Sequence, residues 1–103
     1  MTRANWVSVR EFNGQDLVYV TQIWSWRCGL LEMKIGLNGE DPQILPLPPC
    51  HEDQATPNAI LDGDGLPYIE APVRSVAQIE VHLTYDDLTT DSLRVDRTGR
   101  ILP

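Results

Sequence analysis

Apolar and polar side chains alternate along Val76–Tyr85 with a two-residue period, and this pattern constrains the fold more than any other feature of the chain. Successive residues of a β-strand point to opposite faces of the sheet, so a strand with this period has one apolar and one polar face. Such a strand suits an antiparallel sheet that covers a core with one side and meets water with the other. The apolar face comprises Ala77, Ile79, Val81, Leu83 and Tyr85, and the polar face comprises Gln78, Glu80, His82 and Thr84.

Three turn signals divide the chain into hairpins. Asn-Gly pairs at 13–14 and 38–39 supply the positive φ angles that tight hairpin turns require, and the polar stretch Asp86–Thr90 separates two apolar alternations. Prolines at 46, 48 and 49 cannot donate to a ladder, so the strand that returns from 38–39 should be short and lie at a sheet edge. The predicted hairpins join Trp6–Phe12 to Asp16–Arg27, Leu31–Leu37 to Gln43–Leu47, and Val76–Tyr85 to the segment around Leu93 and Val95.

The segment Asp16–Arg27 is apolar on both faces if it is extended. This is the pattern of a central strand that is covered above and below. By period alone a short apolar run is equally compatible with a helix, but the enrichment in Val, Tyr, Thr, Ile and Trp favours a strand. Leu17, Tyr19 and Ile23 then fall on one face, and Val18, Val20, Trp24 and Trp26 fall on the other.

Residues 48–72, rich in Pro, Asp and Gly, form a long connection between the two halves of the chain. Thr56 as an N-cap, Pro57 at the first helical position and Gly63 as a C-cap allow one short helix at 57–61. Long connections in compact domains often carry function. We therefore expect a single all-β domain over 1–103, an antiparallel β-sandwich or partly open barrel of six to seven strands.

The chain carries 15 acidic and 8 basic side chains and a net charge of −7. This acidic balance repels phosphate backbones and anionic lipid, so we expect neither a nucleic-acid partner nor a membrane partner. No apolar run approaches the roughly 20 residues that span a bilayer, and the N-terminal segment lacks the apolar region of a signal peptide. The sequence therefore predicts a cytoplasmic protein.

The two cysteines, Cys28 and Cys50, flank the 38–39 turn almost symmetrically. Residues equidistant from a hairpin turn lie opposite each other, at a Cα separation that a disulfide can bridge. A cytoplasmic location would instead keep both thiols reduced. Three states therefore stay open: two buried or reduced thiols, a disulfide, or functional chemistry.

Cysteine or metal chemistry is the alternative to a purely structural role. A cation beside a thiol favours the thiolate, but Arg27 directly precedes Cys28 and in a strand would project to the opposite face. Cys50-His51-Glu52-Asp53 mixes soft and hard ligands without the second converging pair that zinc sites need, and Asp62-Gly63-Asp64-Gly65 is too short for an EF-hand loop. A small metal-binding or cysteine-dependent enzyme would have to use Cys28, Cys50, His51 and His82.

Trp24 and Trp26 suggest a third kind of site. Two residues apart on one strand, they would share a face about 7 Å from each other and could stack on a sugar ring or a peptide. The same pair would also fill a core between two sheets, which is where large aromatic side chains most often lie. The core is the preferred interpretation.

Cys28–Gln43, followed by Ser75–Ile101, resembles bacterial immunoglobulin-like and fibronectin-like β-sandwich modules. In these modules a glycine and spaced apolar residues precede an Asn-Gly or Asp-Gly turn, with an aromatic residue where this chain has Ile35. The resemblance implies a sandwich and a role as a spacer or partner-binding unit, and it implies no active site. The residues that carry it are Gly29, Leu30, Met33, Ile35, Leu37, Asn38 and Gly39.

The sequence as a whole favours a non-catalytic binding or accessory domain that acts through protein–protein contacts, with no cofactor. Exposed sheet edges can accept a strand from another chain, so we expect a protein partner or a homodimer through an edge strand. The expected contact surface comprises Ile44, Leu45, Leu47, His51 and Tyr68.

Overall fold

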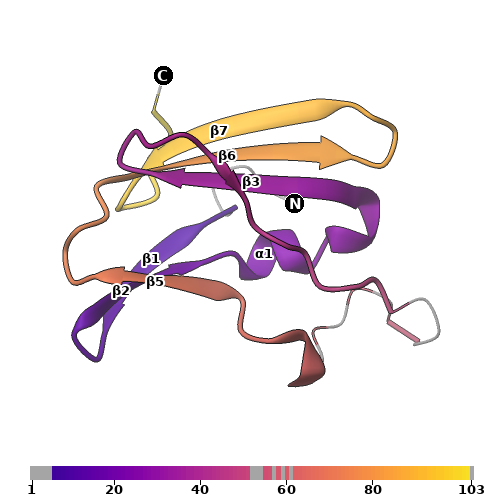
Figure 1. The fold of residues 1–103 in the computed structure, drawn as a ribbon, viewed down its shortest axis with the longest axis horizontal. Coiled ribbons are helices and arrows are strands. Elements are labelled where there is room, and N and C mark those ends of the chain that lie inside the picture. Colours follow the sequence, from indigo (N-terminus) through magenta and orange to yellow (C-terminus); the bar gives the residue numbers. More distant parts are fainter. Residues whose placement is uncertain (1–5, 52–54, 57, 59, 61, 103) are drawn as a thin grey trace.

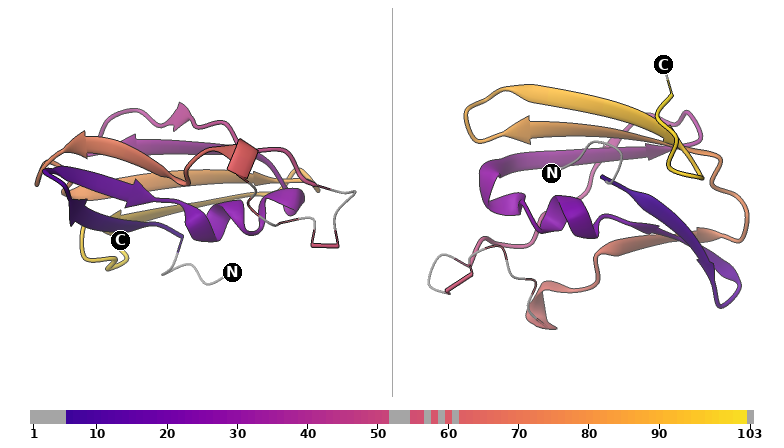
Figure 2. Two further views of the ribbon diagram at one scale, coloured as in Figure 1. Left: turned by 90° about the horizontal axis from the view of Figure 1, so that it is seen from below. Right: turned by 180° about the vertical axis from the view of Figure 1, so that it is seen from behind.

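Seven strands form two antiparallel sheets that face each other in a computed structural model, which describes residues 6–51, 55–56, 58, 60 and 62–102 (Figures 1 and 2). The all-β class and the antiparallel pairing are confirmed, and the arrangement is a sandwich rather than a closed barrel. The first sheet has the strand order β1 (Ser8–Phe12), β2 (Gln15–Tyr19) and β5 (Tyr68–Pro72). The second has the order β4 (Gln43–Ile44), β3 (Leu30–Leu37), β6 (Gln78–Tyr85) and β7 (Thr90–Asp96).

The turn residues act as the sequence predicts. Asn13 and Gly14 both have positive φ, and Phe12 pairs with Gln15 on either side of them. Asn38 and Gly39 also have positive φ at the end of β3, and β4 is a two-residue strand at the edge of its sheet. One boundary differs, because the last five residues of the expected 48–72 connection form β5 against β2.

The hydrophobic core lies between the two sheets and takes one face from each. On β6 the predicted alternation holds, with Ile79, Val81 and Leu83 buried and His82 exposed, but it does not extend to Ala77, which precedes the strand and is exposed. On β2 the inward residues are Asp16 and Val18. The buried core side chains are Trp6, Val7, Val18, Val20, Ile23, Trp24, Leu30, Met33, Ile35, Val76, Ile79, Val81, Leu83, Leu93 and Val95.

The expected single strand over Asp16–Arg27 is wrong beyond Tyr19. Val20 donates its N–H to Pro67 O at 2.8 Å, and the chain then turns into a short helix, α1 (Thr21–Trp24), and a 3₁₀ turn, η2 (Arg27–Gly29). Ile23 and Trp24 enter the core from the buried side of α1. The burial of these two side chains therefore favours the helix more than the local residue preferences favour a strand. The helix expected at 57–61 falls largely on residues 57, 59 and 61, which lie outside the described residues.

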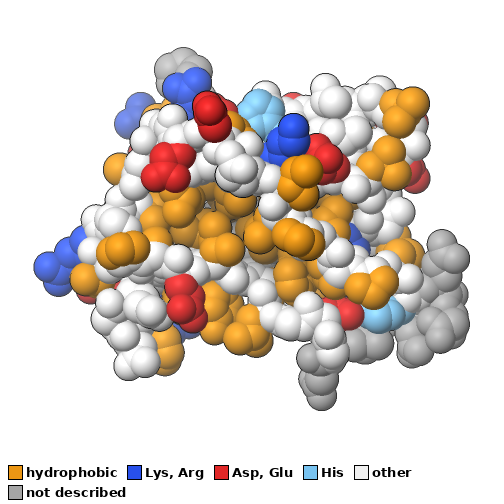
Figure 3. All heavy atoms as spheres, viewed as in Figure 1, with side chains coloured by type: hydrophobic (Ala, Val, Ile, Leu, Met, Phe, Trp, Pro, Cys, Tyr) orange, Lys and Arg blue, Asp and Glu red, His pale blue; other side chains and the backbone are white. Residues whose placement is uncertain are grey.

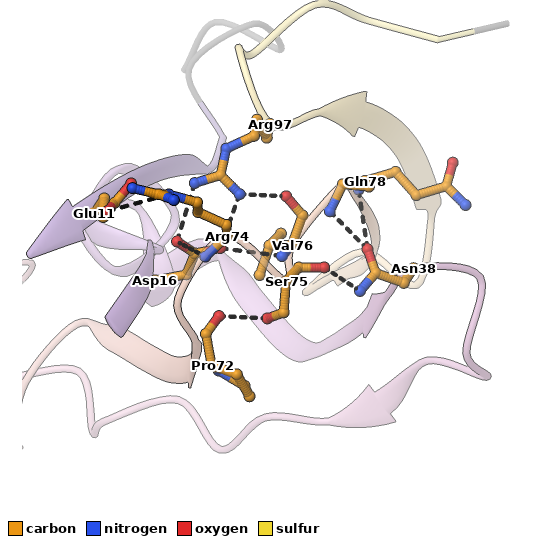
Figure 4. Close-up of polar contacts among 10 residues, drawn as sticks. Glu11, Asp16, Asn38, Pro72, Arg74, Ser75, Val76, Gln78 and Arg97 are labelled. Atoms are coloured by element: carbon orange, nitrogen blue, oxygen red, sulfur yellow. Dashed lines mark hydrogen bonds and ion pairs between the residues drawn. The ribbon is translucent and has the colours of Figure 1, made fainter. Parts of the chain in front are cut away.

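Asp16 and Asn38 hold the connection between β5 and β6, where the chain passes from one sheet to the other (Figure 4). The buried Asp16 carboxylate accepts hydrogen bonds from the N–H groups of Arg74 and Val76, at 2.9 and 3.0 Å. From the second sheet, Asn38 donates to Ser75 O at 2.7 Å and accepts from Ala77 N–H at 2.7 Å. The connection is therefore bonded to both sheets.

Candidate functional site

The outward face of the β1–β2–β5 sheet is the surface with the clearest functional character. Its residues alternate with those that reach the core: Val9, Ile69 and Ala71 pack inward, so their neighbours along the strands point outward. The left view of Figure 2 looks at the molecule from this side. We call this surface the outer face, and it comprises Ser8, Arg10 and Phe12 on β1, Gln15, Leu17 and Tyr19 on β2, and Tyr68, Glu70 and Pro72 on β5.

Apolar and aromatic side chains form the middle of the outer face. Leu17 is only 6% exposed although it lies outside the core cluster, so its side chain is largely shielded from water on this face. Tyr19 and Tyr68 are opposite each other in the register, with ring centroids 5.3 Å apart. Phe12 is 56% exposed, and the Arg10 guanidinium lies 5.4 Å from its ring centroid. Large aromatic groups therefore meet solvent around a leucine that is already desolvated.

Two opposite charges flank this apolar centre. Arg10 on β1 and Glu70 on β5 are the register partners of Leu17 on either side, and both are exposed. Gln15 Nε2 donates to Glu70 Oε2 at 3.4 Å. The outer face thus carries a positive charge on one side, an apolar strip along β2 and a negative charge on the other side.

Of the residues on the outer face, only Tyr68 belongs to the contact surface that the sequence predicts. The other residues of the outer face could have been suspected from β2, which has apolar residues on both of its faces and therefore predicts a cover on each side. The core covers the side of Val18, whereas Leu17 and Tyr19 lie outside the core cluster on the outer face, where Leu17 is buried and Tyr19 is half-buried. The Asn13-Gly14 turn sets the register of β1 on β2 and so places Arg10 beside Leu17, but no local pattern in the sequence reveals the register of β5, which places Glu70 on the other side.

The expected contact residues around β4 lie on a different side of the sandwich. Figure 3 shows hydrophobic side chains in a band between the two sheets, on the side where the chain after β4 crosses in Figure 1. Ile44 is 62% exposed there, while Leu45 and Leu47 are half-buried and pack against the core. Leu45 also donates its N–H to Met33 O at 2.9 Å, which continues the β3–β4 pairing.

The structure joins Cys28 and Cys50 in a disulfide, with Cα atoms 5.0 Å apart. The two residues do not meet as partners in a ladder, since Cys28 lies in η2 and Cys50 lies beyond the short strand β4. The disulfide instead ties the start of the long connection to the turn that precedes β3. Neither sulfur is a thiolate in this state, and a thiolate is what nucleophilic attack and zinc binding require.

Arg27 is buried beside the disulfide and binds the long connection. Its guanidinium donates to the carbonyl oxygens of Pro49, Trp24 and Asn58 at 3.0, 2.9 and 2.6 Å, and lies 3.5 Å from the Asp64 carboxylate. The Asn58 side chain in turn accepts the N–H of Cys28 at 2.9 Å. A buried cation needs partners of this kind, so Arg27 has a structural role rather than that of activating a thiol.

The two histidines lie in separate places. His51 Nε2 lies 2.9 Å from Asp64 Oδ2, and because a carboxylate only accepts, this nitrogen carries the proton. His82 is on the solvent side of β6, 3.0 Å from Glu80. Among the residues that the structure describes, no three His, Cys, Asp or Glu side chains gather as metal ligands. Glu52 and Asp53 lie outside those residues.

The two tryptophans do not form a stacking pair. Trp24 belongs to α1 and is 6% exposed, whereas Trp26 follows the helix and is 53% exposed. The expectation that both share a strand face is therefore wrong, because the segment is helical at this point. The aromatic groups that share one surface are instead the exposed Phe12 and the half-buried Tyr19 and Tyr68.

Comparison with protein-family models, curated proteins and solved structures finds no match to this chain. In the described part of the chain, no helix has the length and apolar character that a membrane crossing requires.

Proposed function

We propose that this chain is a non-catalytic binding domain that acts through protein–protein contacts, and that the outer face of the β1–β2–β5 sheet is its contact surface. The observation that carries the proposal is the environment of β2. Its residues are apolar on both sides, as in a strand covered above and below, but only the side of Val18 belongs to the core between the sheets, whereas the side of Leu17 and Tyr19 lies on the outer face, where Phe12 is 56% exposed. A partner would supply the second cover.

The composition of the outer face supports a protein partner. Aromatic residues and arginine are enriched in protein interfaces, where they often supply the residues that contribute most to binding. Phe12, Tyr19 and Tyr68 supply the aromatic groups, and Arg10 supplies the arginine. Leu17 at the centre is already shielded from water, which is typical of the middle of an interface.

The disulfide weighs against the alternative enzyme. Cys28 and Cys50 would have to be reduced before either sulfur could attack a substrate or bind zinc.

The disulfide also bears on location, because disulfides persist in oxidising compartments and are rare in the cytosol. The cytoplasmic location stays a prediction, and alkylation of free thiols in fresh lysate, followed by mass spectrometry, distinguishes the two environments.

Partner capture from an extract of the source cell tests the proposed contact surface. We expect Phe12→Ser, on the outer face, to lose at least about tenfold in captured partner, because a buried aromatic anchor contributes that much or more. Leu88→Ser is the matched control, since Leu88 is an exposed apolar residue in the β6–β7 turn. Equal capture by the wild type and Phe12→Ser would show that the outer face is not the contact surface.

A further inference from the structure

We propose that the outer face binds a second copy of this chain, face to face, about a twofold axis parallel to β2. This inference rests on the proposed function, since it names the partner for the same surface. It is carried by the order of the side chains across the sheet, which is fixed by the pairing registers of β1 with β2 and of β2 with β5.

Three rows of side chains cross the outer face from β1 to β5. The middle row is positive, apolar and negative in that order, and it is the row that contains the buried leucine. The rows on either side carry one or two aromatic residues each. The rows are Ser8–Tyr19–Tyr68, Arg10–Leu17–Glu70 and Phe12–Gln15–Pro72.

A rotation of 180° about an axis parallel to β2 exchanges the β1 side with the β5 side and keeps each row at its own height. Arg10 then faces Glu70 of the second copy, and Glu70 faces Arg10 of the second copy. The two Leu17 side chains meet on the axis. Phe12 of each copy faces Pro72 of the other, so an exposed aromatic ring meets an apolar residue rather than a charge.

The charges also select this axis over its main competitor. A twofold axis across the strands, in the plane of the interface, would place Arg10 over Arg10 and Glu70 over Glu70. Like charges facing each other at an interface are unfavourable, and complementary ones fix the orientation of the partners. Two sheets packed face to face lie about 10 Å apart, a distance that long side chains such as Arg and Glu span.

The size of the face indicates a weak, reversible dimer. Three strands about 4.8 Å apart and five residues long, at about 3.3 Å per residue, present roughly 250 Å² in the plane of the sheet. Stable interfaces bury about 800 Å² on each partner, so this one belongs with transient contacts. We therefore expect a dimer that forms only at high protein concentration and dissociates on dilution. The net charge of −7 opposes association, and salt near 0.15 M screens that repulsion beyond about 8 Å.

Charge reversal and sedimentation velocity together test the proposed pairing. Arg10→Glu and Glu70→Arg should each weaken self-association at least about tenfold, because each places two repelling pairs in the dimer. The two variants mixed in equal amounts should associate, since each presents the charge that the other lacks. The double variant Arg10→Glu/Glu70→Arg should form homodimers again. Association is measured from about 10 μM to 1 mM protein in 0.15 M salt.

Two controls distinguish a loss of the proposed pairing from an effect of net charge and from misfolding. Arg100→Glu and Glu40→Arg change the net charge by the same amounts and lie at exposed positions away from the outer face. They should dimerise as the wild type does. The melting temperature of every variant reports whether the fold is intact, and the mixture and the double variant give a gain of association that misfolding cannot mimic.

Three results would overturn the inference: a wild-type chain that stays monomeric at about 1 mM, single reversals that associate as the wild type does, or a mixture that fails to associate. The second result would favour pairing through an edge strand. None of these results bears on the capture experiment with Phe12→Ser, so a failure of the dimer and a failure of the contact surface are distinguishable.

Discussion

The Asp16 carboxylate and the Arg97 guanidinium form a paired contact between the two sheets, with Nη1–Oδ2 and Nη2–Oδ1 distances of 2.8 and 3.0 Å. Asp16 belongs to β2 and Arg97 directly follows β7, so the pair joins two residues that are 81 positions apart in the sequence. Arg97 also donates to Val76 O at 2.6 Å, and Asp16 accepts from Val76 N–H. One ion pair thus fixes both sheets and the connection between them (Figure 4).

Asp16→Asn should destabilise the fold strongly. The change leaves Arg97 without its opposite charge in a part-buried position, and breaking a pair of this kind costs far more than losing an exposed one. We expect the melting temperature to fall by roughly 10 °C or more. Glu32→Gln is the matched control, because Glu32 pairs with Lys34 at an exposed position away from Arg97. A fall of equal size in both variants would contradict the special role of Asp16.

The same carboxylate should make stability depend on pH in acid. The hydrogen bonds from Arg97 hold the pKa of Asp16 well below its usual value, assisted by the N–H groups of Val76 and Arg74 and opposed by burial. A group with a lowered pKa in the folded state contributes its full stabilisation above its unfolded pKa, about 3.9, and loses it as the pH falls further. The melting temperature should therefore drop steadily below about pH 4. In Asp16→Asn this dependence should be weaker, and an unchanged slope would count against the assignment.

Loss of the Cys28–Cys50 disulfide should destabilise the fold without abolishing the sheets. The two cysteines are 22 residues apart, and closing a loop of that length contributes about 3 kcal/mol by restricting the unfolded chain. Urea denaturation of Cys28→Ser/Cys50→Ser should show that loss in the free energy of unfolding. A reducing agent should lower the stability of the wild type by a similar amount and leave the double variant unchanged. An insensitive wild type would mean that the thiols are not bonded in solution.

Gly36→Ala tests the close approach between β3 and the turn that follows it. A Cβ atom at position 36 would lie 2.5 Å from Glu40 O and 3.2 Å from the Pro42 backbone, so the backbone would have to shift. Overpacking of this kind costs roughly 1–3 kcal/mol in the free energy of unfolding. Gly29→Ala is the control, because position 29 has open space for a Cβ atom and no positive φ. Equal stability of the two variants in urea would rule out the predicted clash.

The sequence predicted those parts of the fold that depend on neighbouring residues. The alternation of β6 and the Asn-Gly turns at 13–14 and 38–39 are local signals, and the hairpins formed there. The segment after Tyr19 was misassigned because a short apolar run does not distinguish a strand from a turn of helix, and the burial of Ile23 and Trp24 decided between them.

The candidate site was predictable only in outline. The apolar pattern on both faces around Leu17 predicts a second cover, and the Asn13-Gly14 turn places Arg10 opposite Leu17, but the pairing of Leu17 with Glu70 depends on a contact between strands far apart in the sequence. The Asp16–Arg97 pair is hidden for the same reason, since nothing near either residue in the sequence indicates the other.

The way the β5–β6 connection is held also has a consequence for unfolding. Asp16 binds the connection from one sheet and Asn38 binds it from the other, at Arg74, Ser75, Val76 and Ala77. If either sheet opened alone, the backbone groups of the connection on that side would lose their partners while the other side kept them. The two sheets should therefore melt in a single cooperative transition, with the connection acting as the coupling between them.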